Sequence, residues 1–246
     1  MSVQLQISHV RNVLIRLEET IIFALIERTQ FLHNPAIYEP GRFGDVLEGN
    51  SLVGFMLLEC DRSHAKVRRY ASPDELPFFQ NLPAPILPPL QLTENPLNPN
   101  TINYNAQIRN IYEQNIIPHM CRTGDDNEYG SSAVCDVACL QSLSKRIHYG
   151  KFVAESKFRE AKDRLLPAMK NQDAEALMKA ITDDNVENQV LQRVKAKAQT
   201  YTKELETAST SPTVSPEIIT DIYRSWIIPM NKDIQVDYLL QREPNI

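Results

Sequence analysis

Glycine is scarce in this sequence, and its scarcity argues against several classes of enzyme. Only seven of the 246 residues are glycine, and none follows Gly150. Nucleotide-binding folds need glycine where the backbone approaches a phosphate, yet neither G-x-G-x-x-G nor G-x-x-x-x-G-K-[ST] occurs. The glycine-free stretch 151–246 is instead typical of helices.

The usual motifs of metal and nucleophile chemistry are also missing. The five histidines form no H-E-x-x-H pair, no two cysteines have C-x-x-C spacing, and no G-x-S-x-G occurs. Residues 125–130 resemble the start of a calcium loop, but Tyr129 stands at a ligand position. We therefore expect no metal and no cofactor.

Composition limits the partners and the compartment. A net charge of −5 gives no basic footprint for nucleic acid, and no apolar run is long enough to cross a membrane. Residues 1–8 lack the basic and apolar regions of a signal peptide, and the four cysteines have the character of packed thiols. We expect a cytoplasmic protein that binds neither nucleic acid nor membrane.

Apolar periodicity predicts an all-α fold, with long helices forming one bundle over a single domain, 1–246. Val10, Leu14, Leu17, Ile21 and Leu25 recur at the spacing of one helical face. Helices are expected at about 5–33, 51–70, 103–118, 132–160, 161–182 (as shorter pieces), 184–206 and 215–241, the last kinked at Pro229.

A proline-rich crossing separates the second and third predicted helices. Eight of the sixteen prolines lie between Pro73 and Pro99, which favours an extended chain. Large apolar residues such as Phe78, Phe79 and Ile86 are interleaved with them. A solvated linker would not contain so many apolar groups, so we expect the crossing to pack on the helices.

Two helical faces contain candidate site residues. Arg146, Gly150, Val153 and Lys157 are spaced by four, three and four residues, so they share one face, with Gly150 leaving room beside the cations. Ile228, Asn231 and Gln235 share a face of the last helix. Both sets have an ordinary interpretation as solvent-facing side chains; the alternative is an anion pocket inside a helical bundle.

Several stretches together resemble the all-helical chorismate mutases of fungi and plants. The matching segments run in order along nearly the whole chain: Arg11–Phe23, Tyr70–Phe79, Tyr129–Ser132, Cys139–Phe158 and Val236–Leu240. Members of this family convert chorismate to prephenate by a [3,3] rearrangement that needs no nucleophile, base or metal. The resemblance therefore implies an isomerase of aromatic amino acid biosynthesis, expected as a homodimer.

The resemblance also implies roles for individual residues. Arg11 and Arg146 would clamp the substrate's carboxylates, and Lys157 would lie near its ether oxygen and a carboxylate. Glu187 would bind the ring hydroxyl; its local alternative is a capping box with Asp184. The other matching positions are Gln235 near the ether oxygen, Asp183 and Asn231 as substrate contacts, and Val153 and Ile228 as apolar walls.

Three of these positions depart from the common fungal pattern. Asp183 replaces Asn, Asn231 replaces Thr and Gln235 replaces Glu. A glutamate donates to the ether oxygen only when protonated, whereas an amide donates at any ordinary pH. We therefore expect kcat/KM without the loss near neutral pH that a glutamate would impose.

Regulation is a separate implication of the resemblance. In allosteric members tyrosine inhibits and tryptophan activates at a site on the dimer interface. Arg68, Arg69, Gly130 and Ser131 match that site. However, Glu128 and Val134 replace polar residues there, and a carboxylate at 128 disfavours the carboxylate of an effector.

Two alternatives remain at the level of sequence. The first is a catalytically inactive binding or regulatory module that retains the mutase fold, a hypothesis that rests on the three departures. The second is a helical scaffold unrelated to chorismate, in which the cations are a solvated helix edge.

Overall fold

The computed structural model describes residues 7–90, 95–208 and 214–243, and these residues form helices and connecting loops without a strand. The all-helical prediction is thus confirmed. The elements are α1 Ile7–Arg28, α2 Leu52–Lys66, α3 Asn105–Ile111, α4 Ile117–Met120, α5 Tyr129–His148, α6 Gly150–Glu160, α7 Lys162–Lys170, α8 Ala174–Ile181, α9 Asp184–Ala208, α10 Pro216–Ile222 and α11 Ile228–Gln241.

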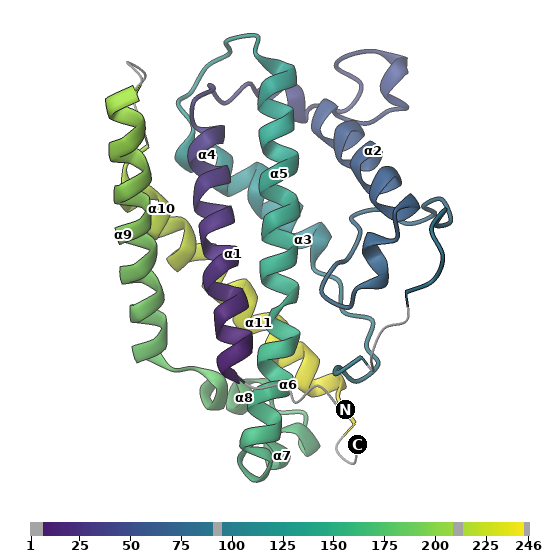
Figure 1. Cartoon of the computed structure of the whole chain (residues 1–246), viewed down its shortest axis with the longest axis vertical. Helices are drawn as coiled ribbons and strands as arrows, with labels where there is room; N and C mark the ends of the chain where they lie inside the picture. The colour runs from purple at the N-terminus through teal and green to yellow at the C-terminus, as the bar shows by residue number, and fades with distance from the viewer. Residues whose placement is uncertain (1–6, 91–94, 209–213, 244–246) are drawn as a thin grey trace.

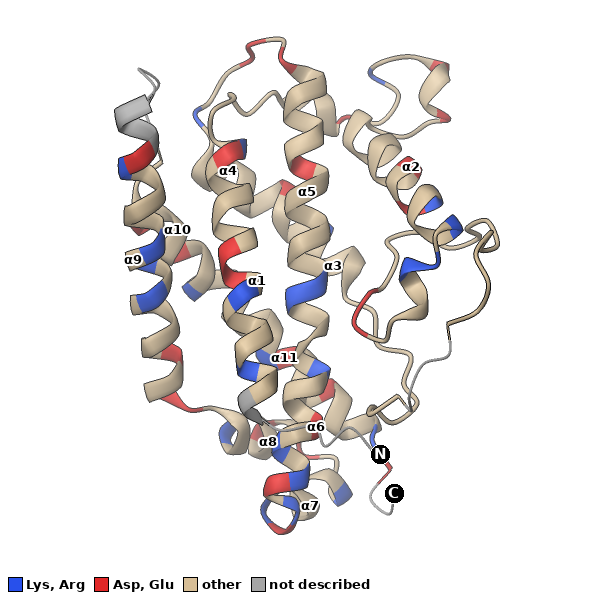
Figure 2. Cartoon of the chain, in the orientation of Figure 1, with Lys and Arg blue, Asp and Glu red and all other residues tan. Residues whose placement is uncertain are grey.

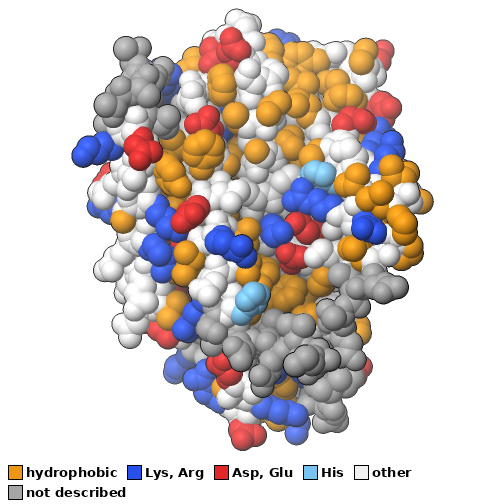
Figure 3. Space-filling model, in the orientation of Figure 1, with side chains coloured by type: hydrophobic (Ala, Val, Ile, Leu, Met, Phe, Trp, Pro, Cys, Tyr) orange, Lys and Arg blue, Asp and Glu red, His pale blue; other side chains and the backbone are white. Residues whose placement is uncertain are grey.

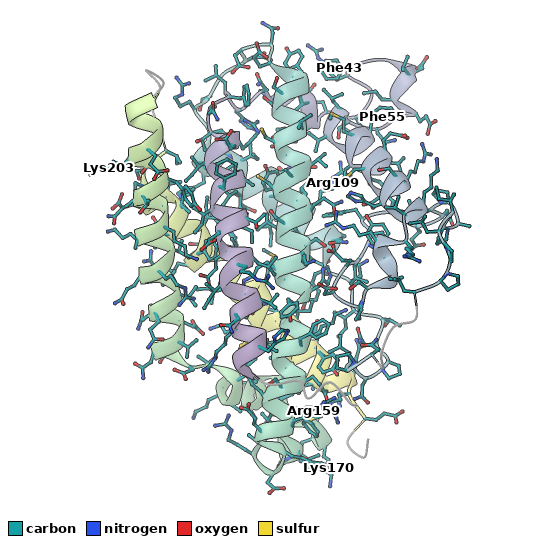
Figure 4. All side chains as sticks on the ribbon, viewed as in Figure 1. Phe43, Phe55, Arg109, Arg159, Lys170 and Lys203 are labelled. Atoms are coloured by element: carbon teal, nitrogen blue, oxygen red, sulfur yellow. The ribbon has the colours of Figure 1, made fainter. Side chains whose placement is uncertain are left out.

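The long helices lie side by side, with α1 between α9 and α5 and with α2 on the far side of α5 (Figure 1). The last helix, α11, packs on α6 and α8. Side chains fill the space between the ribbons, whereas Lys203 on α9 and Lys170 on α7 point away from the bundle (Figure 4). The single helix predicted at 132–160 is divided into α5 and α6, which are nearly continuous, with one turn residue, Tyr149, between them.

Helix α1 ends five residues earlier than predicted because its last residue reorganises the following chain. The guanidinium of Arg28 donates to the carbonyls of Leu32 and His33, both at 3.0 Å, and to the buried carboxylate of Asp136 at 2.6 Å. These bonds fix the turn after the helix and attach it to α5.

Two predicted helices are interrupted by π-helical turns that precede prolines. Residues Tyr112–Ile116 form such a turn before Pro118, and Tyr223–Ile227 form one before Pro229. Proline lacks the N–H that would bond to the preceding turn, so the wider turn accommodates the missing donor. The kink expected at Pro229 therefore begins six residues before it.

The proline-rich crossing is packed at its start and at its end, where Leu97 is buried and the backbone N–H of Asn98 donates to the hydroxyl of Tyr238 at 3.0 Å, and it is exposed between them. The buried carboxylate of Asp61 accepts hydrogen bonds from the backbone of Phe78 at 2.6 Å and of Phe79 at 3.1 Å. Ile86, Leu87 and Leu90, by contrast, are exposed. The expectation that the whole crossing packs on the helices is therefore wrong for residues 86–90.

Gly150 lets α6 and α11 approach each other closely. A Cβ at this position would lie 2.6 Å from Cγ2 of Ile234, 2.7 Å from Nδ2 of Asn231 and 3.0 Å from the backbone oxygen of Asn231. The space expected beside the cations is therefore occupied by α11. This close packing brings Asn231 and Gln235 to the face that contains Arg146 and Lys157.

We predict that Gly150→Ala destabilises the protein by about 1–3 kcal/mol, because the backbone of α11 must move to admit the methyl group. Gly130→Ala is the matched control: it is also helical, and a Cβ there meets nothing within 4 Å. Thermal unfolding of both variants measures the difference. Equal Tm values for Gly150→Ala and the wild type would show that the close approach is not a constraint.

Candidate active site

Helices α1, α5, α6, α9 and α11 enclose a cavity of about 150 Å³. All nine catalytic and substrate-binding residues expected from the sequence line it: Arg11, Arg146, Val153, Lys157, Asp183, Glu187, Ile228, Asn231 and Gln235. Basic positions occur in the lower part of α1, towards the lower end of α5 and on α6, and another lies near the upper end of α1 (Figure 2). The interpretation of these residues as separate, solvated helix faces is therefore wrong.

Arg146 is the most buried charged residue of the cavity. Its residue is 4% exposed, and neither Nε nor Nη1 has a hydrogen-bond partner among the residues that the structure describes. Burial lowers the pKa of the guanidinium, but arginine remains charged in proteins. A buried charge without partners is costly, and an anionic ligand would supply the missing partners.

Glu18 is the carboxylate whose charge acts against the lowering of the Arg146 pKa by burial, and it already forms an ion pair with another arginine. Glu18 on α1 is 1% exposed and accepts both ends of the Arg193 fork, at 2.7 and 2.8 Å. Lys197 is a second cation beside it, at 3.8 Å. Because Arg193 and Lys197 occupy Glu18, the Arg146 guanidinium remains available to a ligand.

Lys157 contributes a second, half-buried cation. Its Nζ donates to the carbonyl of Ile181 at 2.6 Å and to Oε1 of Gln235 at 3.1 Å. Burial lowers the pKa of Lys157 to about 8. An ammonium has three N–H donors, so one donor remains for a ligand in the cavity.

A chain of amides runs from Lys157 to the end of α5. Nε2 of Gln235 donates to the backbone oxygen of Asn231 at 2.8 Å and to its Oδ1 at 3.2 Å. Nδ2 of Asn231 donates to the carbonyls of Arg146 and Ile147, both at 3.3 Å. The amide of Gln235 is therefore oriented with its oxygen towards Lys157 and its donors towards Asn231.

The start of α9 supplies the acidic side of the cavity. Oδ1 of Asp183 accepts hydrogen bonds from the backbone of Asn185 at 3.1 Å and of Val186 at 3.2 Å, so Asp183 caps the helix. The alternative capping box with Asp184 is wrong, and Glu187 is free of a capping role. Instead, Glu187 Oε1 lies 2.9 Å from Nζ of Lys232.

Six cavity residues were not singled out from the sequence. Val10, Leu14, Ile181, Val186 and Val190 extend the apolar wall, and Lys232 adds a cation. The period of α1 and α9 could have identified the apolar positions on these two helices, since they lie close to Arg11 and Glu187, whereas Ile181 is the last residue of α8 and gives no such signal. Lys232 gives no such signal, because lysines on helices are mostly exposed.

The four expected effector residues are not brought together within one chain. Arg69 pairs with Glu75 at 3.0 Å, and Glu75 pairs with Lys145 of α5 at 2.6 Å. Gly130 and Ser131 lie in the first turn of α5, about 21 Å from Lys145 by the 1.5 Å rise of a helix. A site that includes both pairs would need a second copy of the chain.

Other kinds of site find no support in the described part of the chain. It contains no cluster of three or more His, Cys, Asp or Glu side chains that could hold a metal ion. None of its helices is long and apolar enough to span a membrane. The four cysteines are all free.

Comparison with known proteins agrees with the geometry. Residues 129–236 match the family model described as chorismate mutase type II. Chorismate mutase 1 (chloroplastic) of Arabidopsis thaliana is 42% identical over 98% of this chain and 75% of its own length. The chorismate mutase of Schizosaccharomyces pombe is 41% identical over 97% of both chains.

Solved structures show the same likeness in three dimensions. A crystal structure of AtCM1 with tyrosine in its allosteric site superimposes with a TM-score of 0.89, at 44% identity and over 98% of both chains. Aro7p chorismate mutase of Candida albicans, in complex with L-Trp, gives 0.86 at 36% identity, over 97% of this chain and 92% of its own. With relatives this similar over almost its full length, the chain belongs to the chorismate mutase family.

Proposed function

We propose that the cavity binds chorismate and converts it to prephenate, without covalent catalysis. The observation that supports this most strongly is the buried guanidinium of Arg146, whose Nε and Nη1 have no hydrogen-bond partner in the described part of the chain, in a cavity that also contains Arg11 and Lys157. Chorismate has two carboxylates and an enol-ether oxygen, and each can accept hydrogen bonds from these cations.

The rearrangement needs only a fixed conformation and charge stabilisation. The ether carbon–oxygen bond breaks while a new carbon–carbon bond forms between the side chain and the ring. Negative charge grows on the ether oxygen as its bond lengthens. Donors that are already fixed in a low-dielectric cavity stabilise this charge without reorganising, and a close-fitting wall holds the folded conformer.

We assign individual roles from the family resemblance, and the positions of the residues in the cavity support them. Arg146, deep in the cavity, and the exposed Arg11 bind the carboxylates, while Lys157 donates to the ether oxygen and a carboxylate. Glu187 accepts the hydrogen bond of the ring hydroxyl. Val153 and Ile228 form apolar walls, and Asn231 and Asp183 hold the cavity in shape through the amide chain and the cap of α9.

Gln235 must exchange a hydrogen bond to act as a donor. Both of its N–H groups point to Asn231, the weaker contact being 3.2 Å to Oδ1. In our proposal the ether oxygen takes over this weaker bond while the 2.8 Å bond to the backbone stays. The Lys157 contact to Oε1 of Gln235 polarises the amide and strengthens its donors.

An inactive binding module would not require all nine of the expected catalytic and substrate-binding residues to line one cavity. The three departures at 183, 231 and 235 take part in hydrogen bonds that shape the cavity, so they are compatible with turnover.

Effector control would require a homodimer, which we also propose. Exposed apolar residues lie beside both halves of the expected effector site: Val67, Ile86 and Leu87 near Arg68, and Phe43 and Val134 near Ser131. Apolar side chains also gather over the upper part of the face in Figure 3. Patches of this kind mark interfaces, and a second copy that covers both would join Arg68 and Arg69 to Gly130 and Ser131.

The compartment is a further proposal. Four free cysteines fit a reducing environment, and we propose the cytoplasm. Cell fractionation decides this, and recovery of the protein with an organelle would contradict it.

Arg146→Ala should lower kcat/KM for chorismate by about a hundred- to a thousandfold, because a fixed donor to the substrate is lost. Arg146→Met should be as inactive, yet its free energy of unfolding should be unchanged or higher by about 1–3 kcal/mol, since an unpaired buried charge is removed. Loss of chorismate absorbance and thermal unfolding measure the two effects. Turnover by Arg146→Ala at the wild-type rate would reject the proposed function.

The pH profile of kcat/KM should be flat from about pH 5 to 7.5 and fall above pH 8. Gln235 does not titrate, whereas Lys157, with a pKa of about 8 in the free protein, is protonated below that pH and neutral above it. Gln235→Glu should introduce a loss between pH 5 and 8. A wild-type profile that already falls steeply over that range, with Gln235→Glu no worse, would contradict the assignment of Gln235.

Tyrosine should lower and tryptophan should raise the rate of chorismate conversion, and Arg69→Ala should abolish both responses without loss of the basal rate. Arg62→Ala is the control, an exposed arginine of α2 paired with Glu59. Light scattering should give twice the 28.1 kDa of one chain. Rates that neither amino acid changes would exclude effector control.

A further inference from the structure

Lys232 is a cavity residue for which the proposed mechanism has no role. It lies on α11 between the amide chain and solvent, next to Asn231 in sequence. Its Nζ is 2.9 Å from Oε1 of Glu187, and the two side chains are 25% and 27% exposed. The pair therefore joins α11 to the first turn of α9 across the cavity that both residues line.

The charge of the cavity depends on this lysine. Among the described residues that line it, the cations are Arg11, Arg146, Lys157 and Lys232, and the anions are Asp183 and Glu187. Their net charge is +2, which balances a substrate with two carboxylates. Without Lys232, the carboxylate of Glu187 would lie uncompensated beside a dianion, and like charges at short range repel.

Geometry also separates Lys232 from the groups that would touch the reacting atoms. Arg146 is buried, and the ammonium of Lys157 bonds to Ile181 and Gln235 inside the cavity, whereas the ammonium of the partly exposed Lys232 is at hydrogen-bond distance from Glu187. A carboxylate held by an ammonium has a restricted orientation, so its second oxygen can be aimed at a ligand hydroxyl.

We propose that Lys232 is a positioning residue that acts through Glu187: it fixes this carboxylate to accept the substrate's ring hydroxyl and cancels its charge next to the substrate's carboxylates. This inference rests on the proposed function. Because both effects apply to the bound substrate as well as to the transition state, they act mainly on KM.

A double-mutant cycle tests the proposal with four proteins: the wild type, Lys232→Met, Glu187→Gln and the double variant. Lys232→Met should raise KM for chorismate about tenfold and change kcat much less. In the Glu187→Gln background the same substitution should change kcat/KM less than about twofold, because the group on which Lys232 acts is already neutral. Lys232→Arg, which keeps the ion pair, should restore most of the wild-type KM.

Lys195→Met is the matched control, since Lys195 forms a comparable pair with Glu217 at 3.1 Å away from the cavity, and this variant should keep the wild-type kinetic constants. Thermal unfolding of each variant confirms that it is folded. An unchanged KM for Lys232→Met, or the same fold loss in both backgrounds, would overturn the proposal while the wild type still converts chorismate. An inactive wild type would instead refute the proposed function and this inference with it.

Discussion

The site depends on a positive charge that the protein buries without neutralising it. Arg146 lies inside the bundle with two guanidinium nitrogens lacking a partner in the described chain, and removing such a charge from water costs several kcal/mol. The surrounding structure keeps it in this state. Glu18, the acidic group that could neutralise it, accepts both hydrogen bonds of Arg193 instead, so the charge of Arg146 remains available to a ligand.

The side of the cavity that α11 forms depends on a close backbone contact between α11 and α6. Gly150 admits α11 against α6, and this contact places Asn231 where it bonds to the carbonyls at the end of α5. Gln235 then takes its orientation from Asn231 and from Lys157. The side chains around the cavity are thus held in place without a ligand, and in our proposal only the weaker bond from Gln235 to Asn231 is exchanged on binding. Donors that are fixed in advance stabilise a developing charge effectively.

Local periodicity was sufficient to predict part of this arrangement. The spacing of Arg146, Val153 and Lys157 placed them on one face, and that of Asn231 and Gln235 placed them on another. No local pattern shows that Arg11 and Glu187, far apart in sequence, meet these faces; that expectation came from resemblance to a family. Helix lengths were predicted to within a few residues where caps and prolines mark the ends.

The remaining features depend on which of several neighbouring polar groups forms a given contact, either locally or with a distant segment. The Arg28 bonds that end α1 early, the cap supplied by Asp183 and the pairing of Lys232 with Glu187 all involve choices between neighbouring polar groups that periodicity does not distinguish. The exposure of Ile86 and Leu87 is equally invisible to composition, because an apolar residue packs as well on a second chain as on its own.

The central claim is that the Arg146 guanidinium awaits an anionic ligand. Nitrogen-15 NMR of the arginine Nε–H groups, titrated with prephenate, tests it most directly. The Arg146 signal, assigned by its absence from Arg146→Met, should shift downfield and become protected from exchange as a carboxylate bonds to it. An Arg146 Nε–H signal that saturating prephenate leaves unchanged would show that this guanidinium does not bind the anionic ligand.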